Sequence, residues 1–185
     1  MPGSVIPGLC MRAAPIAARG HRVPAYPQMP PDAHQLLREN YGRVARDLLS
    51  PILELMTEAH RAFGGDAEKF HILLLLAQRM AEHPDSAAFD LPAVEAGRCD
   101  TLPALATNVK SIAASTGIPE ETVRRKVRAL VRDGWIAREG NDLTYTAKAA
   151  GELSAVRNLM LRAAVANHRT VERLAVEAPS RVELP

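Results

Sequence analysis

A run of arginines on one side of a predicted helix is the feature of this sequence with the clearest chemistry. In the segment that begins near Pro119, Val123, Val127 and Leu130 point the same way at about 100° per residue. The opposite side carries Glu121, Arg124, Arg125, Arg128 and Arg132. Guanidinium groups attract phosphates and can donate two hydrogen bonds to guanine in the major groove. This face therefore predicts contact with double-stranded DNA.

The first two turns of such a helix hold the residues that reach base edges. Here they are Glu120, Glu121, Thr122, Arg124 and Arg125. The Glu121 carboxylate can accept a hydrogen bond from cytosine N4. Paired carboxylates bring no benefit to a protein that contacts phosphate alone, so they favour base reading, although both also suit a helix N-terminus on dipole grounds. Arg128 and Arg132 lie further along the helix and are predicted to contact phosphates.

A helix-turn-helix is the element that would position these side chains. A short helix is predicted from about Val109 to Gly117. Gly117 can adopt the positive φ that the turn requires. Ser111 lies in this first helix and is a further candidate DNA contact. The second helix, residues 119–132, is the predicted recognition helix, and Ile112 and Ile118 share a core with its inward face.

A small hairpin is predicted directly after the second helix. Asp133-Gly134 stops the helix, and the strands Trp135 to Glu139 and Leu143 to Thr146 flank a turn that contains Gly140. Arg138, on the first strand, is the candidate DNA contact of this wing. The predicted fold class is mainly α, a winged helix-turn-helix with a three-helix core and a small β-hairpin, flanked by long dimerisation helices.

Long amphipathic segments bracket this motif. In the first segment, from Ala33, apolar residues recur at Leu37, Tyr41, Val44, Leu48, Ile52, Leu55 and Ala59. Ser50-Pro51 indicates either a kinked helix or two short ones. One continuous helix is predicted from about Ala147 to Glu177, with a stripe of Leu153, Val156, Met160, Ala163, Asn167, Val171 and Leu174. A two-fold homodimer with intertwined helices is the simplest way to bury both stripes.

These patterns divide the chain into six segments. Residues 1–31, with seven prolines and no acidic residue, are predicted to be a disordered tail. Residues 32–83 form N-terminal helices, among them a buried helix from Ala67 to Glu82 with His71 in the core. Residues 84–108 form an irregular connection with a helical turn near Leu102 to Ala106. The winged helix-turn-helix spans 109–146, the C-terminal dimerisation helix spans 147–178, and 179–185 fray.

The second helix of the motif resembles the recognition helix of the cyclic-AMP receptor protein family. The residues that carry this resemblance are Gly117, Glu121, Thr122, Val123 and Arg125. It covers only about residues 109–146, because that family's cyclic-nucleotide barrel has no counterpart here. The resemblance implies that Glu121 and Arg125 read bases and that Thr122 contacts phosphate.

The whole layout is similar to the MarR family of bacterial transcription regulators. Tyr145 to Lys148 and Gly151 to Leu153 resemble the strand that leads into the last helix of that family. The resemblance implies a bacterial regulator that binds double-stranded DNA through a winged helix. The Asp-x-Arg signature that the family carries near the wing tip is missing, which leaves Arg138 as the wing candidate.

Several other classes of function are not supported by the sequence. The net charge of +2 says little about partners, because the distribution of charge matters more than its sum. Cys10 and Cys99 match no ligand spacing and no segment resembles a secretory signal, so we expect no disulfide framework, metal or cofactor, and a cytoplasmic location. No run is long enough to span a membrane. No catalytic motif is present, so we do not expect an enzyme.

Two alternatives to a sequence-specific regulator remain open at this point. The winged helix could serve as a protein-interaction module, since fold alone does not determine function. It could also belong to a DNA accessory factor with little sequence preference. A cleft beside the helices could hold a small-molecule effector, whose identity the sequence does not reveal.

Overall fold

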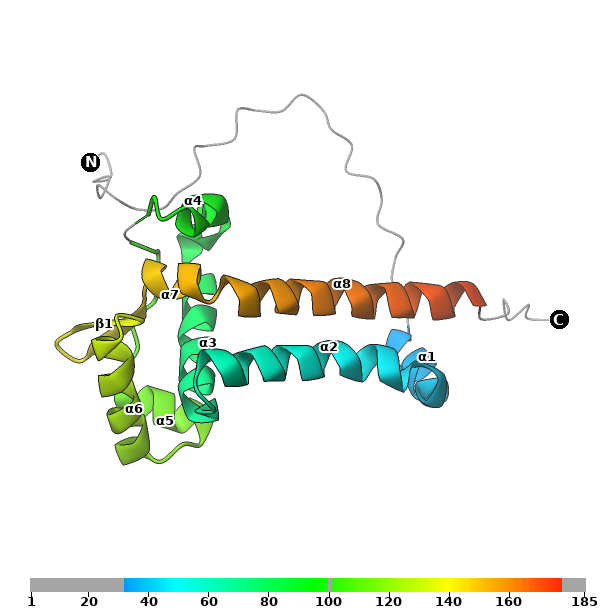
Figure 1. The fold of residues 1–185 in the computed structure, drawn as a ribbon, viewed down its shortest axis with the longest axis horizontal. Helices are drawn as coiled ribbons and strands as arrows, with labels where there is room; N and C mark the ends of the chain where they lie inside the picture. The colour runs from blue at the N-terminus through cyan, green and yellow to red at the C-terminus, as the bar shows by residue number, and fades with distance from the viewer. Residues whose placement is uncertain (1–31, 100, 178–185) are drawn as a thin grey trace, which may run out of the picture. The chain divides into compact units, whose positions relative to one another are not determined.

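The structure is a computed structural model, in which residues 32–99 and 101–177 are described; they are mainly helical, with one small antiparallel sheet (Figure 1). The helices are α1 (Ala33–Glu39), α2 (Tyr41–Ala62), α3 (Ala67–Ala81), the 3-10 helix η1 (Pro84–Ala88), α4 (Leu91–Glu95), α5 (Val109–Thr116), α6 (Glu120–Arg132), α7 (Ala147–Glu152) and α8 (Ser154–Glu177). The strands are β1 (Ile136–Glu139) and β2 (Asp142–Tyr145). The predictions for residues 1–31 and 179–185 fall outside the described residues.

The chain divides into two compact units. The described part of the first unit is Ala59–Ser154, and that of the second comprises residues 32–58 and 155–177. Among the described residues, no helix combines the length and apolar character that crossing a membrane requires.

Three helices and the hairpin form the core of the first unit. Helices α3, α5 and α6 each contact the other two, while β1 packs on α6 and β2 on α3. The strands pair in antiparallel register, with Ile136 opposite Tyr145 and Glu139 opposite Asp142. The predicted inward residues Ile112, Val123, Val127 and Leu130 are all buried, together with Phe63, Ile72, Leu73, Leu76, Ile136 and Leu143. This core fixes the orientation of α6.

Helix α3 is buried on one side only, so the prediction of a helix buried all round is wrong. Ile72 and Leu73 are in the core, but Leu74 is 39% exposed and His71, which was predicted to be a core residue, is exposed. Consecutive apolar residues on a helix point about 100° apart, so a run of them cannot all face one neighbour.

The connection between α3 and α5 differs from its prediction. It contains helical turns at η1 and α4, whereas Leu102 to Ala106 is not helical. The Asp90 side chain caps α4 by accepting a hydrogen bond from the Ala93 amide at 3.1 Å, a local signal for a helix start. Thr107 exchanges backbone hydrogen bonds with Leu143 at 3.1 and 2.8 Å, which ties the end of the connection to β2.

The predicted C-terminal helix is interrupted. Helix α7 ends at Glu152, Leu153 adopts φ −91° and ψ 18°, and α8 begins at Ser154. Gly151 lowers the helical propensity just before the break, which lies at the boundary between the two units.

The second unit contains α1, most of α2 and nearly all of α8. Asn40 ends α1 and its side chain donates to the Leu36 carbonyl at 2.9 Å, whereas α2 runs without interruption through Pro51. Ion pairs of 2.7 Å between Arg43 and Glu177 and 2.6 Å between Asp47 and Arg173 join α2 to α8. Parts of both predicted stripes are buried within the single chain, at Val44, Val156, Val171 and Leu174.

Cys99 is disulfide-bonded, a bond that the sequence analysis, which expected no disulfide framework, did not anticipate.

Candidate nucleic-acid interface

The turn between α5 and α6 is built by local signals in the sequence. Asn108 caps α5, because its side chain accepts a hydrogen bond from the Ser111 amide at 3.0 Å. Gly117 ends α5 at φ 71°, in the left-handed region, as the sequence predicted. Its amide donates to the Ala113 carbonyl at 2.9 Å. Pro119 precedes the first residue of α6, so the predicted start of this helix is confirmed to within one residue.

Replacing Gly117 with alanine is expected to destabilise the protein by about 1–2 kcal/mol, because a Cβ strains the left-handed conformation. No atom lies within 4 Å of where that Cβ would stand, so the loss is purely conformational. Gly117→Asn is expected to lose less, since asparagine tolerates this region. Urea denaturation measures both effects. Gly42→Ala, in a helix with open space around it, is the control and should be neutral or stabilising; a neutral Gly117→Ala would contradict the argument.

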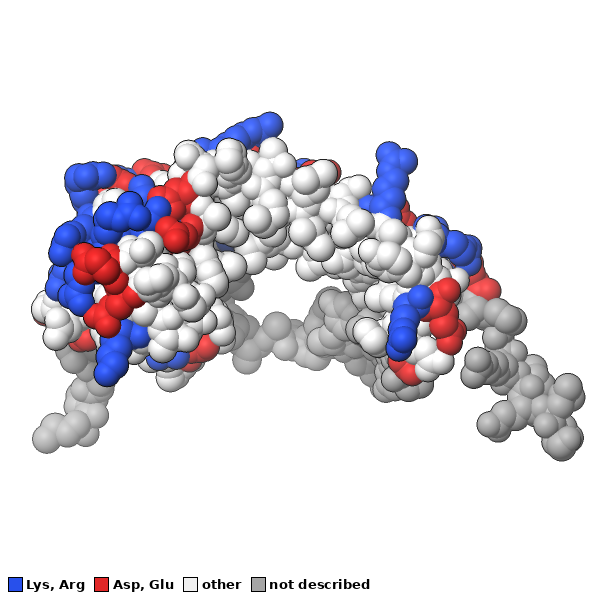
Figure 2. Space-filling view, turned by 90° about the horizontal axis from the view of Figure 1, so that it is seen from below, with Lys and Arg blue, Asp and Glu red and all other residues white. Residues whose placement is uncertain are grey.

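The outer face of α6 gathers most of the predicted site residues. It consists of Glu120, Glu121, Arg124, Arg125, Arg128 and Arg132, all exposed. Figure 2 shows blue and red side chains together at the left of the view, where Figure 1 places α5 and α6. The helix therefore has one face of mixed charge, with arginines in excess, and one apolar face.

The arginines of the outer face differ in their partners. Arg124 pairs with Glu120 at 2.5 Å and its Nε lies 3.4 Å from a Glu121 oxygen, so two carboxylates hold it along the helix. Arg125 and Arg128 have no ion pair or side-chain hydrogen bond with any described residue. Their guanidinium groups are therefore free to meet an anion without breaking an existing contact.

Arg132 is intermediate between these cases. Its side chain is 77% exposed, and its Nε lies 3.5 Å from the Asp133 carboxylate. An exposed pair of this kind contributes little to stability, so it would exchange readily for a phosphate.

Three predicted site residues lie apart from the outer face or at its edge. Ser111 is exposed on α5, and Thr122 is half-buried on α6. Arg138 is exposed on β1, but its Nε donates to the Gly140 carbonyl at 2.9 Å, which folds the side chain over the hairpin turn. An exposed cation that the sequence reading missed, Lys110, lies on α5 without an ion pair to any described residue.

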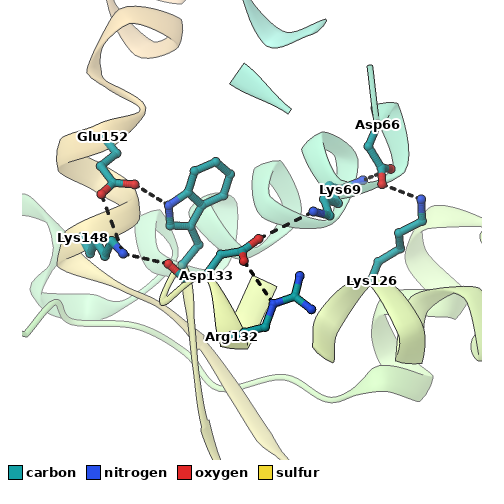
Figure 3. A network of polar contacts seen from close by, with 8 residues as sticks. Asp66, Lys69, Lys126, Arg132, Asp133, Lys148 and Glu152 are labelled. Atoms are coloured by element: carbon teal, nitrogen blue, oxygen red, sulfur yellow. Dashed lines mark hydrogen bonds and ion pairs between the residues drawn. The ribbon is translucent and has the colours of Figure 1, made fainter. Parts of the chain in front are cut away.

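The inner side of α6 carries a charged residue that the sequence reading did not single out. Lys126 donates to Asp66 at 2.6 Å (Figure 3). It also lies 3.1 Å from a Glu68 oxygen, and its side chain is only 12% exposed. The hydrogen bond to Asp66 raises the pKa of Lys126, an effect that burial opposes. Burial works to raise the pKa of Asp66, but hydrogen bonds from Lys126 and Lys69 outweigh it and lower that pKa. This pair ties α6 to the start of α3.

A second set of contacts holds the C-terminal end of α6. Asp133 lies 3.6 Å from Lys69 of α3, and its carbonyl accepts a hydrogen bond from Lys148 of α7 at 2.8 Å (Figure 3). Trp135 packs edge-on against Phe63, with ring centroids 5.2 Å apart, and donates to Glu152 at 2.6 Å. Helix α6 is thus fixed at its middle and at its end, while its outer face stays open.

Other kinds of site find less support in the first unit. In the described part of the chain, no three His, Cys, Asp or Glu side chains are grouped as a metal site would require. An open cleft of about 490 Å³ lies between α4 and α7, and Val94, Lys148, Gly151 and Glu152 are among the residues that line it. It has room for a small molecule.

Comparison of this chain with family models, with curated proteins and with solved structures found no match.

Proposed function

We propose that this protein is a sequence-specific DNA-binding transcription regulator that places α6 in the major groove. The observation that carries the proposal is the pair Arg125 and Arg128, two exposed guanidinium groups without partners among the described residues, on a helix whose opposite face is buried. Arg125 lies in the first two turns and is assigned to base reading, whereas Arg128 and Arg132 are assigned to phosphates.

The packing of the first unit supports a winged helix-turn-helix. Helices α3, α5 and α6 contact one another, and the β1–β2 hairpin follows α6 directly. This is the order of a three-helix core with a wing. Because Arg138 folds over its own turn, the wing is assigned mainly to covering the core, through Ile136 and Leu143.

The regulator is proposed to act as a homodimer. Two α6 helices related by a two-fold axis would enter successive major grooves about 34 Å apart on a nearly palindromic site. Dimeric binding also doubles the number of arginines that face phosphate, which strengthens the dependence of affinity on salt.

Selection of bound sequences from a pool of random duplexes tests this proposal. We expect enrichment of one short motif, repeated with inverted symmetry at a spacing of one helical turn. Salt-dependent binding without enrichment would instead indicate an accessory factor that contacts phosphates alone. Absence of binding to the pool at low salt would exclude DNA as the partner and favour a protein-interaction module.

A further inference from the structure

Three charged side chains in the first two turns of α6 pair with one another, and we call Glu120, Glu121 and Arg124 the Arg124 cluster. Arg124 lies 2.5 Å from a Glu120 oxygen, and its Nε lies 3.4 Å from a Glu121 oxygen. Both carboxylates stand in the first turn of α6, where the helix dipole favours negative charge, and their spacing to the arginine favours the ion pairs. With one positive and two negative charges, the cluster has a net charge of −1.

The Arg124 cluster differs from the ion pair at the other end of α6. There Asp133 lies 3.5 Å from Arg132 and also 3.6 Å from Lys69, so it keeps a cationic partner when Arg132 turns toward a phosphate. In the part of the chain that the structure describes, the two carboxylates of the Arg124 cluster have no ion pair outside it. Movement of Arg124 to a phosphate would therefore leave two carboxylates without a cation beside the DNA, where like charges repel.

We propose that Glu120 and Glu121 hold Arg124 away from phosphate and thereby limit the affinity of α6 for unrelated DNA. This inference rests on the proposed function and concerns the same face of the helix. Phosphate contacts supply nearly all of the non-specific affinity of a DNA-binding protein, because each contact releases counterions whatever the sequence. An arginine that stays with its carboxylates adds no such contact, whereas Arg125 and Arg128 remain available to the duplex. The two carboxylates therefore raise the ratio between specific and non-specific affinity.

The salt dependence of binding to an unrelated duplex tests this role, because its slope reports the number of phosphate contacts. In the otherwise wild-type protein, Arg124→Ala should change the slope little. Arg128→Ala, the matched control on the same face, should reduce the slope by about one unit for each bound helix. Replacing both carboxylates (Glu120→Gln with Glu121→Gln) should steepen the slope by about one unit and raise the affinity for the unrelated duplex at least about fivefold at physiological salt, since Arg124 then gains a phosphate.

The same substitution in the glutamine background makes the test specific to Arg124. There Arg124→Ala should remove the added unit of slope, which it does not do in the wild type. An equal steepening with and without Arg124 would mean that the carboxylates only repel phosphate, and would overturn the inference. A wild-type slope that falls as much for Arg124→Ala as for Arg128→Ala would also overturn it.

Circular dichroism checks that each of these variants is folded. Absence of binding to any duplex at low salt would overturn the proposed function together with this inference. The two outcomes above overturn the inference alone, because each of them requires that the protein binds the duplex.

Discussion

Replacing Arg125 with alanine is expected to weaken binding to the selected duplex by about 1–3 kcal/mol and to relax the sequence preference at one position of each half-site. The side chain is exposed on the outer face of α6 and has no partner among the described residues. Binding of DNA by Arg125 therefore breaks no contact with another described residue. Alanine removes two donors that, among the base edges of the major groove, only guanine can accept together. Titrations of a labelled selected duplex and of a scrambled duplex, at matched salt, measure the difference.

The control for Arg125→Ala is the same change at Arg132. That side chain lies in the last turn of α6, away from the residues that reach base edges, and is 77% exposed. Its loss should weaken binding to both duplexes alike and reduce the salt slope by about one unit. Base reading by Arg125 would be wrong if the two variants lost the same affinity on both duplexes.

Arg124 and Arg125 differ in the structure in a way that the sequence analysis did not distinguish. Both arginines of the pair 124–125 stand in the first two turns, and the sequence treated them alike. In the structure Arg124 is held by Glu120 and Glu121, whereas Arg125 has no ion pair within residues 32–99 and 101–177. The signal was present, because carboxylates three and four residues before an arginine share its side of a helix. Because its carboxylate partners hold Arg124, we propose that Arg125 has the stronger role in base reading.

The local elements of the site could be predicted because their signals are contained in a few adjacent residues. Gly117 marks the end of α5 and Gly134 follows the end of α6, and the structure places both at positive φ. Asn108 caps α5 in the same local way. Hydrophobic spacing also gave the inward face of α6, since a helix period fixes which residues lie together.

The long-range elements could not be predicted, because they depend on residues far apart in the chain. The apolar run of α3 has no clear period, so nothing indicated which side faces α5 and α6. The contact between Lys126 and Asp66 joins residues 60 positions apart. The break at Leu153 lies where the chain divides into two units. No local feature of the sequence indicates that division. Tertiary packing decided each of these features.

Asp66→Ala is expected to lower the free energy of unfolding by about 2–4 kcal/mol, the sum of a helix cap and a charged hydrogen bond. One carboxylate oxygen accepts from the Lys69 amide at 3.1 Å and caps α3, and the other accepts from Lys126 at 2.6 Å. Asp66→Asn keeps an oxygen for the cap and loses the charge, so it should lie between the wild type and the alanine variant. Glu68→Gln, at a carboxylate that is 44% exposed, is the matched control and should lose least. Chemical denaturation measures the free energy of unfolding of each variant and so gives their order of stability.

The pH dependence separates the charge of Asp66 from its role as a cap. The native pKa of Asp66 is lower than its ordinary value of 3.8, so its charge stabilises the fold above that pH and stops doing so as the pH falls through the native value. Asparagine does not titrate, so the gap between wild type and Asp66→Asn should be constant near neutral pH and close below about 3.8. The gap between Asp66→Asn and Asp66→Ala should persist, because a cap oxygen is present at every pH. A gap between wild type and Asp66→Asn that survived at acid pH would mean that α6 is not held by the charge of Asp66.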